Sequence, residues 1–245
     1  MGEAPRLPDI DWELWLGRAW KAALAALLVF ILVWLNRVVP PQHLPWKPLD
    51  PEAPVGLATR AQLMRVAVSP SATCRELAES FTPLDSVAAD PKRGDGPCGF
   101  EIARVVSAVG NVELAGQSSM QCPLSVGVAI WLREADRIAQ ERLGEPLARV
   151  HHYGSYSCRR MYGRSSGRWS EHAFANAWDV ASFETESGNV VSLKGDWGGG
   201  GERAAFLREV RDAACDVFRV TLGPDYNAAH ADHFHVDMGP SSTCR

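Results

Sequence analysis

Residues 170–179 read SEHAFANAWD, and residues 230–237, much later in the chain, read HADHFHVD. Together these two stretches hold four of the seven histidines of the protein. The spacing of His172 and Asp179 does not suit one helical face, but it suits a loop residue followed by a strand residue, because residues 177–183 alternate well enough to be extended. In the second stretch, an extended backbone places His233, His235 and Asp237 on one face of a strand and the apolar residues between them on the other.

These residue types indicate a metal site. Imidazole and carboxylate are the ligands of a catalytic zinc ion that keeps one position open for water. We therefore expect one zinc ion, held by His172, Asp179 and one or both of His233 and His235. The alternative is a surface loop histidine and an unrelated histidine cluster. Asp179 argues against it, because its neighbours in AWDVA are apolar and an unpaired buried charge is costly.

Composition limits the class of protein. The chain has 245 residues, which suits one or two domains, and 46% hydrophobic residues, which suffices for a core. Its net charge is -4, and no basic patch dominates the sequence, so nucleic acid is not an expected partner.

The cysteines point to an oxidising compartment. All six lie after residue 70 and none forms a CxxC pair, which argues against a thiolate zinc site. Their even number favours disulfides over buried free thiols. The sequence does not choose the pairing; we consider a Cys158–Cys215 bridge, which would fix the segment beside Arg159 against the helix before the last strand.

The N-terminal region predicts a membrane anchor. Residues 1–18 are polar and are expected in the cytoplasm, and residues 19–39 form an apolar segment interrupted by Lys21, whose side chain can snorkel. A cleaved signal peptide is the main competitor, but no small-x-small cleavage pattern follows the segment. A buried helix of a soluble protein is the other alternative. Residues 40–69 are expected to form a stiff Pro-rich linker and a short helix, and residues 70–245 a soluble domain.

The expected fold class of this domain is α+β. We expect a small antiparallel sheet that carries the zinc site, flanked by helices and stapled by disulfides. Helices are expected at 58–66, 123–143 and 202–222, and a loop-rich segment at 74–98. Strands are expected within 100–114, at 147–153, in a hairpin of 177–183 with 189–193, and finally at 233–238.

The residues also resemble a known family. The pattern Ser-x-His-(x)6-Asp with a late His-x-His strand is similar to the LAS-type zinc peptidases, which include D-Ala-D-Ala carboxypeptidases and cell-wall endopeptidases. A closer resemblance is to the bacterial extensin-like C-terminal domain family, over roughly residues 70–245. It is carried by the segments 156–159 (YSCR), 170–172 (SEH), 177–179 (AWD), 206–208 (FLR), 222–225 (LGPD) and 230–235 (HADHFH).

The resemblance implies a role for individual residues. His172, Asp179 and His235 match the three zinc ligands, with water in the fourth position. The general base is either His233 or Asp232, and strand parity favours His233. Arg159 matches an arginine that grips a substrate carboxylate or carbonyl. Ser170 and His230 are assigned with it to substrate binding. One departure is Ala175, where the group often has glycine; this matters little if the local φ is negative.

The implied function is hydrolysis of a peptide bond in peptidoglycan by a zinc-activated water. The substrate partner is then a peptidoglycan peptide. The protein is expected in the bacterial inner membrane as a single-pass protein whose soluble domain lies in the periplasm. The alternative is a binding module that holds the cell wall on a degenerate peptidase fold and cuts nothing.

Overall fold

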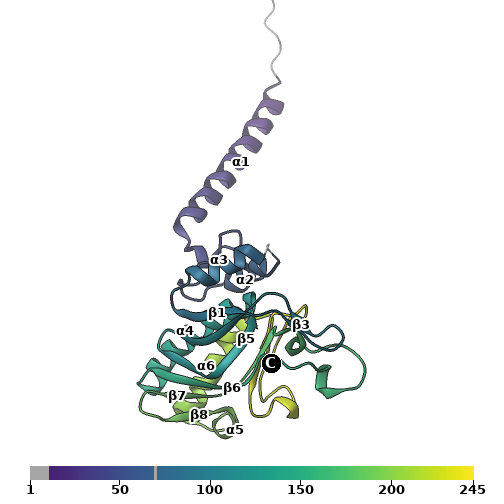
Figure 1. Ribbon diagram of the computed structural model, residues 1–245. Coiled ribbons are helices and arrows are strands. Elements are labelled where there is room, and N and C mark those ends of the chain that lie inside the picture. Colours follow the sequence, from purple (N-terminus) through teal and green to yellow (C-terminus); the bar gives the residue numbers. More distant parts are fainter. Residues whose placement is uncertain (1–10, 69–70) are drawn as a thin grey trace, which may run out of the picture.

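The computed structural model describes residues 11–68 and 71–245, and Figure 1 shows their arrangement. The first element is the long helix α1, Trp12–Val38, whose N-cap Asp11 accepts a hydrogen bond from the backbone N–H of Leu14. None of its residues is buried, and it is long and apolar enough to cross a membrane. With the disulfides described below, this is consistent with a single-pass membrane protein whose domain lies outside the cytoplasm.

The Pro-rich segment after α1 is folded against the domain, not held as an extended spacer as expected. It contains the short 3-10 helix η1 (Pro41–His43), and Leu44 is buried. The buried amide of Gln62 donates hydrogen bonds to the carbonyls of Pro41 and Leu44, at 2.8 and 2.9 Å. Several prolines in succession predict an extended chain, but their carbonyls remain free to accept hydrogen bonds, and Gln62 supplies the donors.

The helices α2 (Thr59–Val68) and α3 (Ser71–Ser80) follow, and α2 contributes Leu63 to the main core. The expected helix at 58–66 is therefore present. The segment 74–98, expected to be loop-rich, instead holds most of α3 and the strands β1 and β2. The remaining elements, several of them short, are β1 (Leu84–Ala89), β2 (Lys92–Arg93), β3 (Gly99–Phe100), β4 (Ala103–Val109), β5 (Val112–Gln121), α4 (Cys122–Leu143), β6 (Leu147–Gly154), η2 (Met161–Gly163), η3 (Glu171–Phe174), β7 (Ala177–Thr185), β8 (Val190–Ser192), α5 (Leu193–Asp196), α6 (Gly201–Val217), β9 (Val220–Leu222), η4 (Ala228–His230), β10 (Phe234–Asp237) and β11 (Thr243–Cys244).

The α+β class is confirmed, but the sheet is neither small nor purely antiparallel. Within the described residues, nine strands form one sheet in the order β1-β4-β5-β6-β7-β10-β9-β11, with β8 paired to β7. The pairs β5/β6 and β9/β11 are parallel. The first of these follows from α4, because a crossover through a long helix returns the chain in the same direction. The edge strands were missed because their side chains do not alternate cleanly.

The core lies between the sheet and the helices α4 and α6, which pack against each other on one face of the sheet (Figure 1). Trp131 of α4 is at its centre, with edge-on contacts to Trp178, Phe183 and Phe218, and its indole N–H donates to the carbonyl of Val210 at 2.8 Å. Such aromatic pairs add to the burial energy of the rings. Because side chains alternate along β7, burying Trp178 turns Asp179 to the opposite face.

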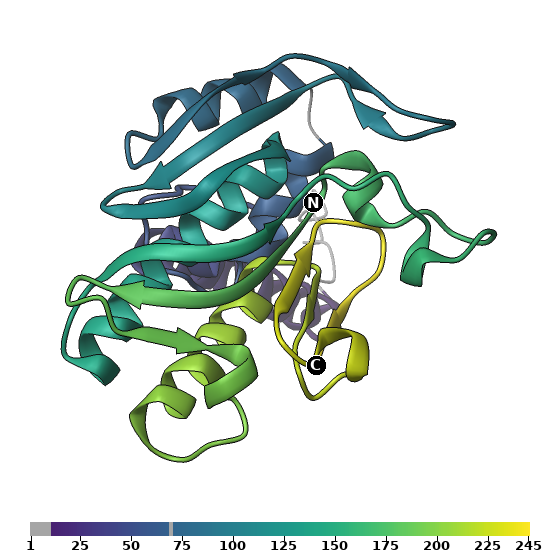
Figure 2. The same cartoon turned by 60° about the horizontal axis from the view of Figure 1, so that its bottom comes forward.

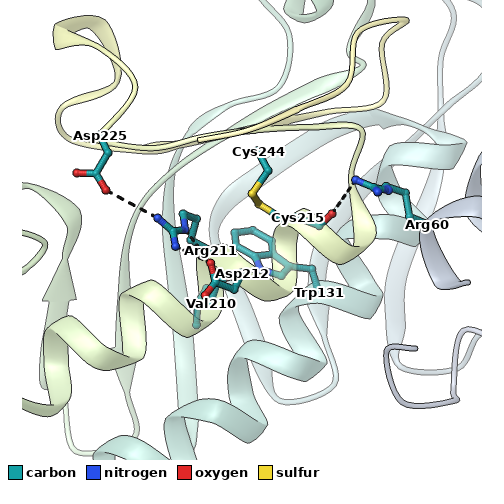
Figure 3. The surroundings of a disulfide bond; sticks show 8 residues. All are labelled: Arg60, Trp131, Val210, Arg211, Asp212, Cys215, Asp225 and Cys244. Carbon is teal, nitrogen blue, oxygen red and sulfur yellow. Dashed lines mark hydrogen bonds and ion pairs between the residues drawn. A yellow bond between two sulfur atoms is a disulfide. The ribbon is translucent and has the colours of Figure 1, made fainter. Parts of the chain in front are cut away.

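Three disulfides join all six cysteines, each of which lies in the described part of the chain: Cys74–Cys122, Cys98–Cys158 and Cys215–Cys244. The expected Cys158–Cys215 bridge is therefore wrong. Figure 3 shows Cys215, near the end of α6, bonded to Cys244. The reason is that β11 pairs in parallel with β9, directly after α6, and so returns Cys244 to the end of that helix.

Two further boundaries differ from the expectation. The helix expected at 202–222 ends at Val217, and residues 220–222 form β9 instead. The sequence VFRVTL at 217–222 is rich in β-branched and aromatic residues, which favour a strand once a partner such as β10 is available. The strand expected at 233–238 is β10, but β11 follows it and ends the sheet.

Candidate metal centre

Three elements bring together the side chains of His172, Asp179 and His235. His172 lies in the 3-10 helix η3, whose N-cap Ser170 accepts a hydrogen bond from the backbone N–H of His172 at 3.3 Å. Asp179 and His235 lie directly opposite each other in the antiparallel pair β7/β10. Cross-strand partners have neighbouring side chains on the same face, so the register of the sheet fixes this pair. The 3-10 helix supplies the third member from outside the sheet.

The ligand atoms are close enough to share one ion. Nε2 of His172 is 3.1 Å from Oδ2 of Asp179, Nδ1 of His235 is 2.9 Å from Oδ1 of Asp179, and the two nitrogens are 3.2 Å apart. In a tetrahedral zinc site, bonds near 2.0 to 2.2 Å place ligand atoms about 3.3 Å from each other. The observed triangle has nearly this size, and the three residues form a group able to hold a metal ion.

The outer nitrogens of both histidines are held by acceptors. Nδ1 of His172 lies 3.1 Å from the backbone carbonyl of Ser155, and Nε2 of His235 lies 3.0 Å from Oδ2 of Asp237. A carbonyl or carboxylate oxygen can only accept, so these outer nitrogens carry the protons. In the neutral rings, the inner nitrogens then direct lone pairs at each other and at the Asp179 carboxylate. The three groups therefore repel one another unless a proton or a metal ion lies among them, and the outer contacts are of the kind that orient metal-binding histidines.

The pKa shifts of His235 and Asp179 also indicate that the cluster favours a positive charge at its centre. Burial lowers the pKa of His235, but its hydrogen bonds with the carboxylates of Asp179 and Asp237 outweigh burial and raise that pKa to about 9. Burial raises the pKa of Asp179, but hydrogen bonds from His172 and His235 outweigh it and hold the pKa far below its usual range. Both shifts favour a positive charge at the centre of the cluster, which a proton or a metal ion supplies.

His233 approaches the same centre from just before β10. Its Nδ1 lies 2.9 Å from Oδ1 of Asp232, and its Nε2 lies 3.7 Å from Oδ1 of Asp179. The hydroxyl of Tyr153 donates to Oδ2 of Asp232 at 3.4 Å, and the Tyr153 ring packs edge-on against His233. Asp232 therefore holds Nδ1–H of His233 and leaves Nε2 as the free acceptor beside the ligands. Asp232 itself points toward His233 and Tyr153.

The cluster opens into a cavity of about 260 Å³. Of the remaining residues that the sequence assigned to the site, only Asp232 does not line this cavity. Arg159 and Ser170 line it, and Ser170 also caps η3 as described. His230 lines it with a pKa that burial, aided by the nearby His235 and His233, lowers to about 4, so the ring is neutral at pH 7. Its Nδ1 is 2.8 Å from Oδ1 of Asn227. The two sequence stretches thus meet at one cavity.

Sequence reasoning gave no role to some residues that shape this site. Asp237 orients His235, and its position on the face of His233 and His235 was the signal that could have identified it. Tyr153, Ser155 and the half-buried Glu171 carried no comparable signal, because their contacts arise only in the folded chain. Ala175 has a φ of +54°, not the negative value under which its departure from glycine would matter little. A non-glycine residue there costs about 1 kcal/mol.

Comparison with known proteins gives one match. The family model described as Extensin-like protein C-terminus matches residues 59–245. The match includes the residues of the candidate metal centre, the cavity and all six cysteines, and it begins at the first residue of α2. No curated protein and no solved structure matches the chain.

Proposed function

The chain belongs to the extensin-like protein C-terminus family, and from this premise we propose that it is a zinc peptidase that hydrolyses a peptide bond in peptidoglycan. The observation that carries the proposal is the pair of inner nitrogens of His172 and His235, held 3.2 Å apart beside the Asp179 carboxylate. Two imidazoles and one carboxylate, with a cavity on the open side, are the donor set of catalytic zinc sites in hydrolases. The proposal includes kinship with the LAS-type peptidases.

The residues fit a zinc ion by donor type and by spacing. His172, Asp179 and His235 would hold it, and Ser155 and Asp237 would keep the two rings in the ligating tautomer. When bound with an open position, zinc lowers the pKa of its water to about 7 and polarises a carbonyl group. These two effects are what peptide hydrolysis requires of the centre.

Proton transfer and substrate binding are assigned to His233, Asp232 and Arg159. Nε2 of His233 is free to take a proton from an attacking water and to return it to the leaving amine. Asp232 keeps His233 in the tautomer that can do so and stabilises its protonated form; we therefore assign the base to His233 and a positioning role to Asp232. The guanidinium of Arg159 at the cavity is suited to hold a carbonyl or carboxylate of the substrate.

The proposed location is the periplasm of a bacterium, with α1 in the inner membrane. Disulfides require an oxidising compartment, and a domain attached to that membrane on its outer side lies beside the cell wall. This supports peptidoglycan as the substrate.

The test uses the full chain purified in detergent. Metal analysis should find about one zinc ion per chain, and incubation with isolated sacculi should release soluble peptide-containing fragments. His172→Ala should lose both, whereas the matched control His151→Ala, on β6 and bonded to Glu184, should lose neither. A zinc-free protein, or equal fragment release by His172→Ala, would refute the peptidase. Zinc with tight binding to sacculi and no release would identify a non-catalytic wall-binding module instead.

A further inference from the structure

A basic hairpin projects from the domain beside the cavity. We call residues 159–169 the basic arm; its sequence RRMYGRSSGRW contains four arginines. Figures 1 and 2 show it leaving the body of the domain on the same side as the β2–β3 hairpin, to which Cys98–Cys158 joins its base. The protein has a net charge of -4, so this concentration of positive charge is local and stands against the overall charge.

The arm has a defined shape. Its two sides are paired by backbone hydrogen bonds from Ser170 to Arg159 and from Met161 to Arg168, at 3.1 and 3.0 Å, and by a bridge between Arg160 and Trp169. Below this ladder, the N–H of Ser157 bonds the carbonyl of His172 at 3.0 Å. The pairing therefore runs from Met161 and Arg168 down to His172 of the candidate metal centre, and it joins the base of the arm to that centre.

Within the described residues no arginine of the arm forms an ion pair, although Arg168 lies near enough to Glu171 to oppose the burial that raises the pKa of that carboxyl. In the described part of the chain, the side chains of Arg159, Arg164 and Arg168 have no hydrogen bond or ion pair, and Arg160 donates only to the carbonyl of Gly167. Seven arginines elsewhere in the described residues do pair with a carboxylate, among them Arg137, Arg142 and Arg203. Four like charges on an eleven-residue hairpin repel one another, which an anionic ligand would relieve.

Aromatic side chains hold two of these guanidinium groups in place. Arg160 lies over the ring of Trp169 at 4.3 Å, and Arg164 lies near the ring of Tyr162 at 5.7 Å. A stacked guanidinium uses its face for the ring and keeps its N–H edge for an acceptor, so less freedom is lost when it binds a carboxylate in bidentate fashion. Arg159 and Arg168 line the cavity, which makes the arm continuous with the candidate centre.

The direction of the arm argues against a lipid surface. Figure 1 shows the arm on the far side of α2 and α3 from α1, so its arginines do not lie at the end of the domain from which α1 leaves. A charged surface there meets material away from the bilayer. Peptidoglycan peptides carry free carboxylates in addition to the bond that is cut, and these are the anions that the wall presents.

We propose that the basic arm, through Arg164 and Arg168, is a second binding subsite that holds a substrate carboxylate remote from the scissile bond. The inference rests on the proposed function for the nature of the polymer. It predicts that blocking the free carboxylates of the peptide weakens binding, whether or not the scissile bond is hydrolysed.

The test measures co-sedimentation of the full chain with isolated sacculi. All proteins carry His233→Ala, so that turnover does not consume the probe and binding is measured apart from catalysis. Arg164→Gln with Arg168→Gln is compared with Arg75→Gln with Lys194→Gln, which removes the same charge from α3 and α5. The first pair should weaken binding about tenfold and the second less than about twofold. Replacing Arg164 and Arg168 by lysine should restore part of the loss.

Chemical modification of the polymer gives the second readout. Converting sacculus carboxylates to methylamides should weaken binding of the parent protein about tenfold and leave the arginine-to-glutamine arm variant nearly unchanged. Equal binding by the arm variant and its control, or equal binding to modified sacculi, overturns the subsite while leaving the peptidase proposal intact. Failure of every protein to bind sacculi overturns both. Arm-dependent binding to phosphatidylglycerol vesicles, with sacculus binding unaffected, would assign the arm to lipid and also overturn the subsite.

Discussion

Nε2 of His172 and Nδ1 of His235 lie 3.2 Å apart although 63 residues separate them in the chain. Each ring has its outer nitrogen held by an acceptor, and the inner nitrogen of each faces the other ring and Asp179. Two inner lone pairs and a carboxylate repel one another in a buried place unless a proton or a metal ion lies among them.

Asp237→Asn should weaken zinc binding roughly 10- to 100-fold without removing a ligand. The amide can accept from Nε2–H of His235 only in one orientation, and it no longer adds negative charge behind the ring. Competition with a chelator of known affinity measures the effect. Asp90→Asn, at an exposed position, is the matched control and should not change the affinity. An unchanged affinity in Asp237→Asn would show that this carboxylate plays no part in metal binding.

The metal-free protein should lose stability as the pH rises from about 6.5 to about 9. The folded-state pKa of His235, about 9, exceeds its ordinary value of 6.5, so the charged ring stabilises the fold fully below pH 6.5 and that contribution is lost above it. The loss can reach about 3 kcal/mol. Asp179 and His230 add nothing to this slope, because their pKa values are lowered and they do not change charge in this window.

Denaturant unfolding of the full chain in detergent with a chelator, at several pH values, measures this dependence. Zinc-loaded protein should lack it, because the ion replaces the proton among the three ligands. His235→Gln should also lack it. A slope of the same size in His235→Gln would place its origin elsewhere.

His233→Ala should lower the rate of sacculus hydrolysis by about 10² to 10⁴-fold and leave zinc content unchanged. Asp232→Asn should lower the rate less, because His233 keeps Nε2 but loses the carboxylate that holds its Nδ1–H and fixes its tautomer. Partial rescue by Asp232→Glu, with zinc content unchanged, separates a positioning role from a structural one. Full activity in His233→Ala together with none in Asp232→Asn would exchange the two roles.

Gln62→Ala should open the segment 41–57 while the domain remains folded. The buried amide donates to the carbonyls of Pro41 and Leu44, and its removal leaves both without these donors, at a cost of about 1 to 3 kcal/mol. Limited proteolysis should then cut within 41–57 at a higher rate than in the wild type. Gln140→Ala, which removes an exposed bond to Asp136 on α4, is the control. Equal cleavage rates would show that Gln62 does not hold the segment.

The candidate site was more predictable than the sheet around it. Alternation in residues 233–238 places His233 and His235 on one face, and alternation in 177–183 places Asp179 opposite Trp178. That these faces meet depends on the pairing of β7 with β10 and on the position of η3, which the sequence indicated only through ligand chemistry and resemblance. Asp232 shows where the strand pattern stops being informative. Alternation predicted that its side chain faces away from the site, but β10 begins only at Phe234, and before it Asp232 can bond the ring of His233.

The errors have two physical origins. Disulfide pairing depends on which strand neighbours which, and the return of β11 to β9 has no local signal. The length of α6 was overestimated because residues 217–222 suit a strand only when β10 is beside them. The prolines of 40–54 correctly indicate an extended backbone, but they carry no information about the buried donor, Gln62, that fastens them. For the disulfides and the proline segment, long-range contacts decided the outcome; for 217–222, the strand propensity of the residues was outweighed in the prediction by the helical spacing before them.

The bonded proline segment limits how far the domain can move from α1. A flexible chain of that length would let the domain sample a wide range of positions, whereas the segment bonded to Gln62 keeps α2 close to the end of α1. With α1 in a membrane, the cavity with the candidate metal centre therefore stays at a nearly constant height above the bilayer. For the proposed peptidase, this restricts the substrate to the layer of wall nearest the membrane, and the size of the domain, not the number of linker residues, sets the distance that it reaches.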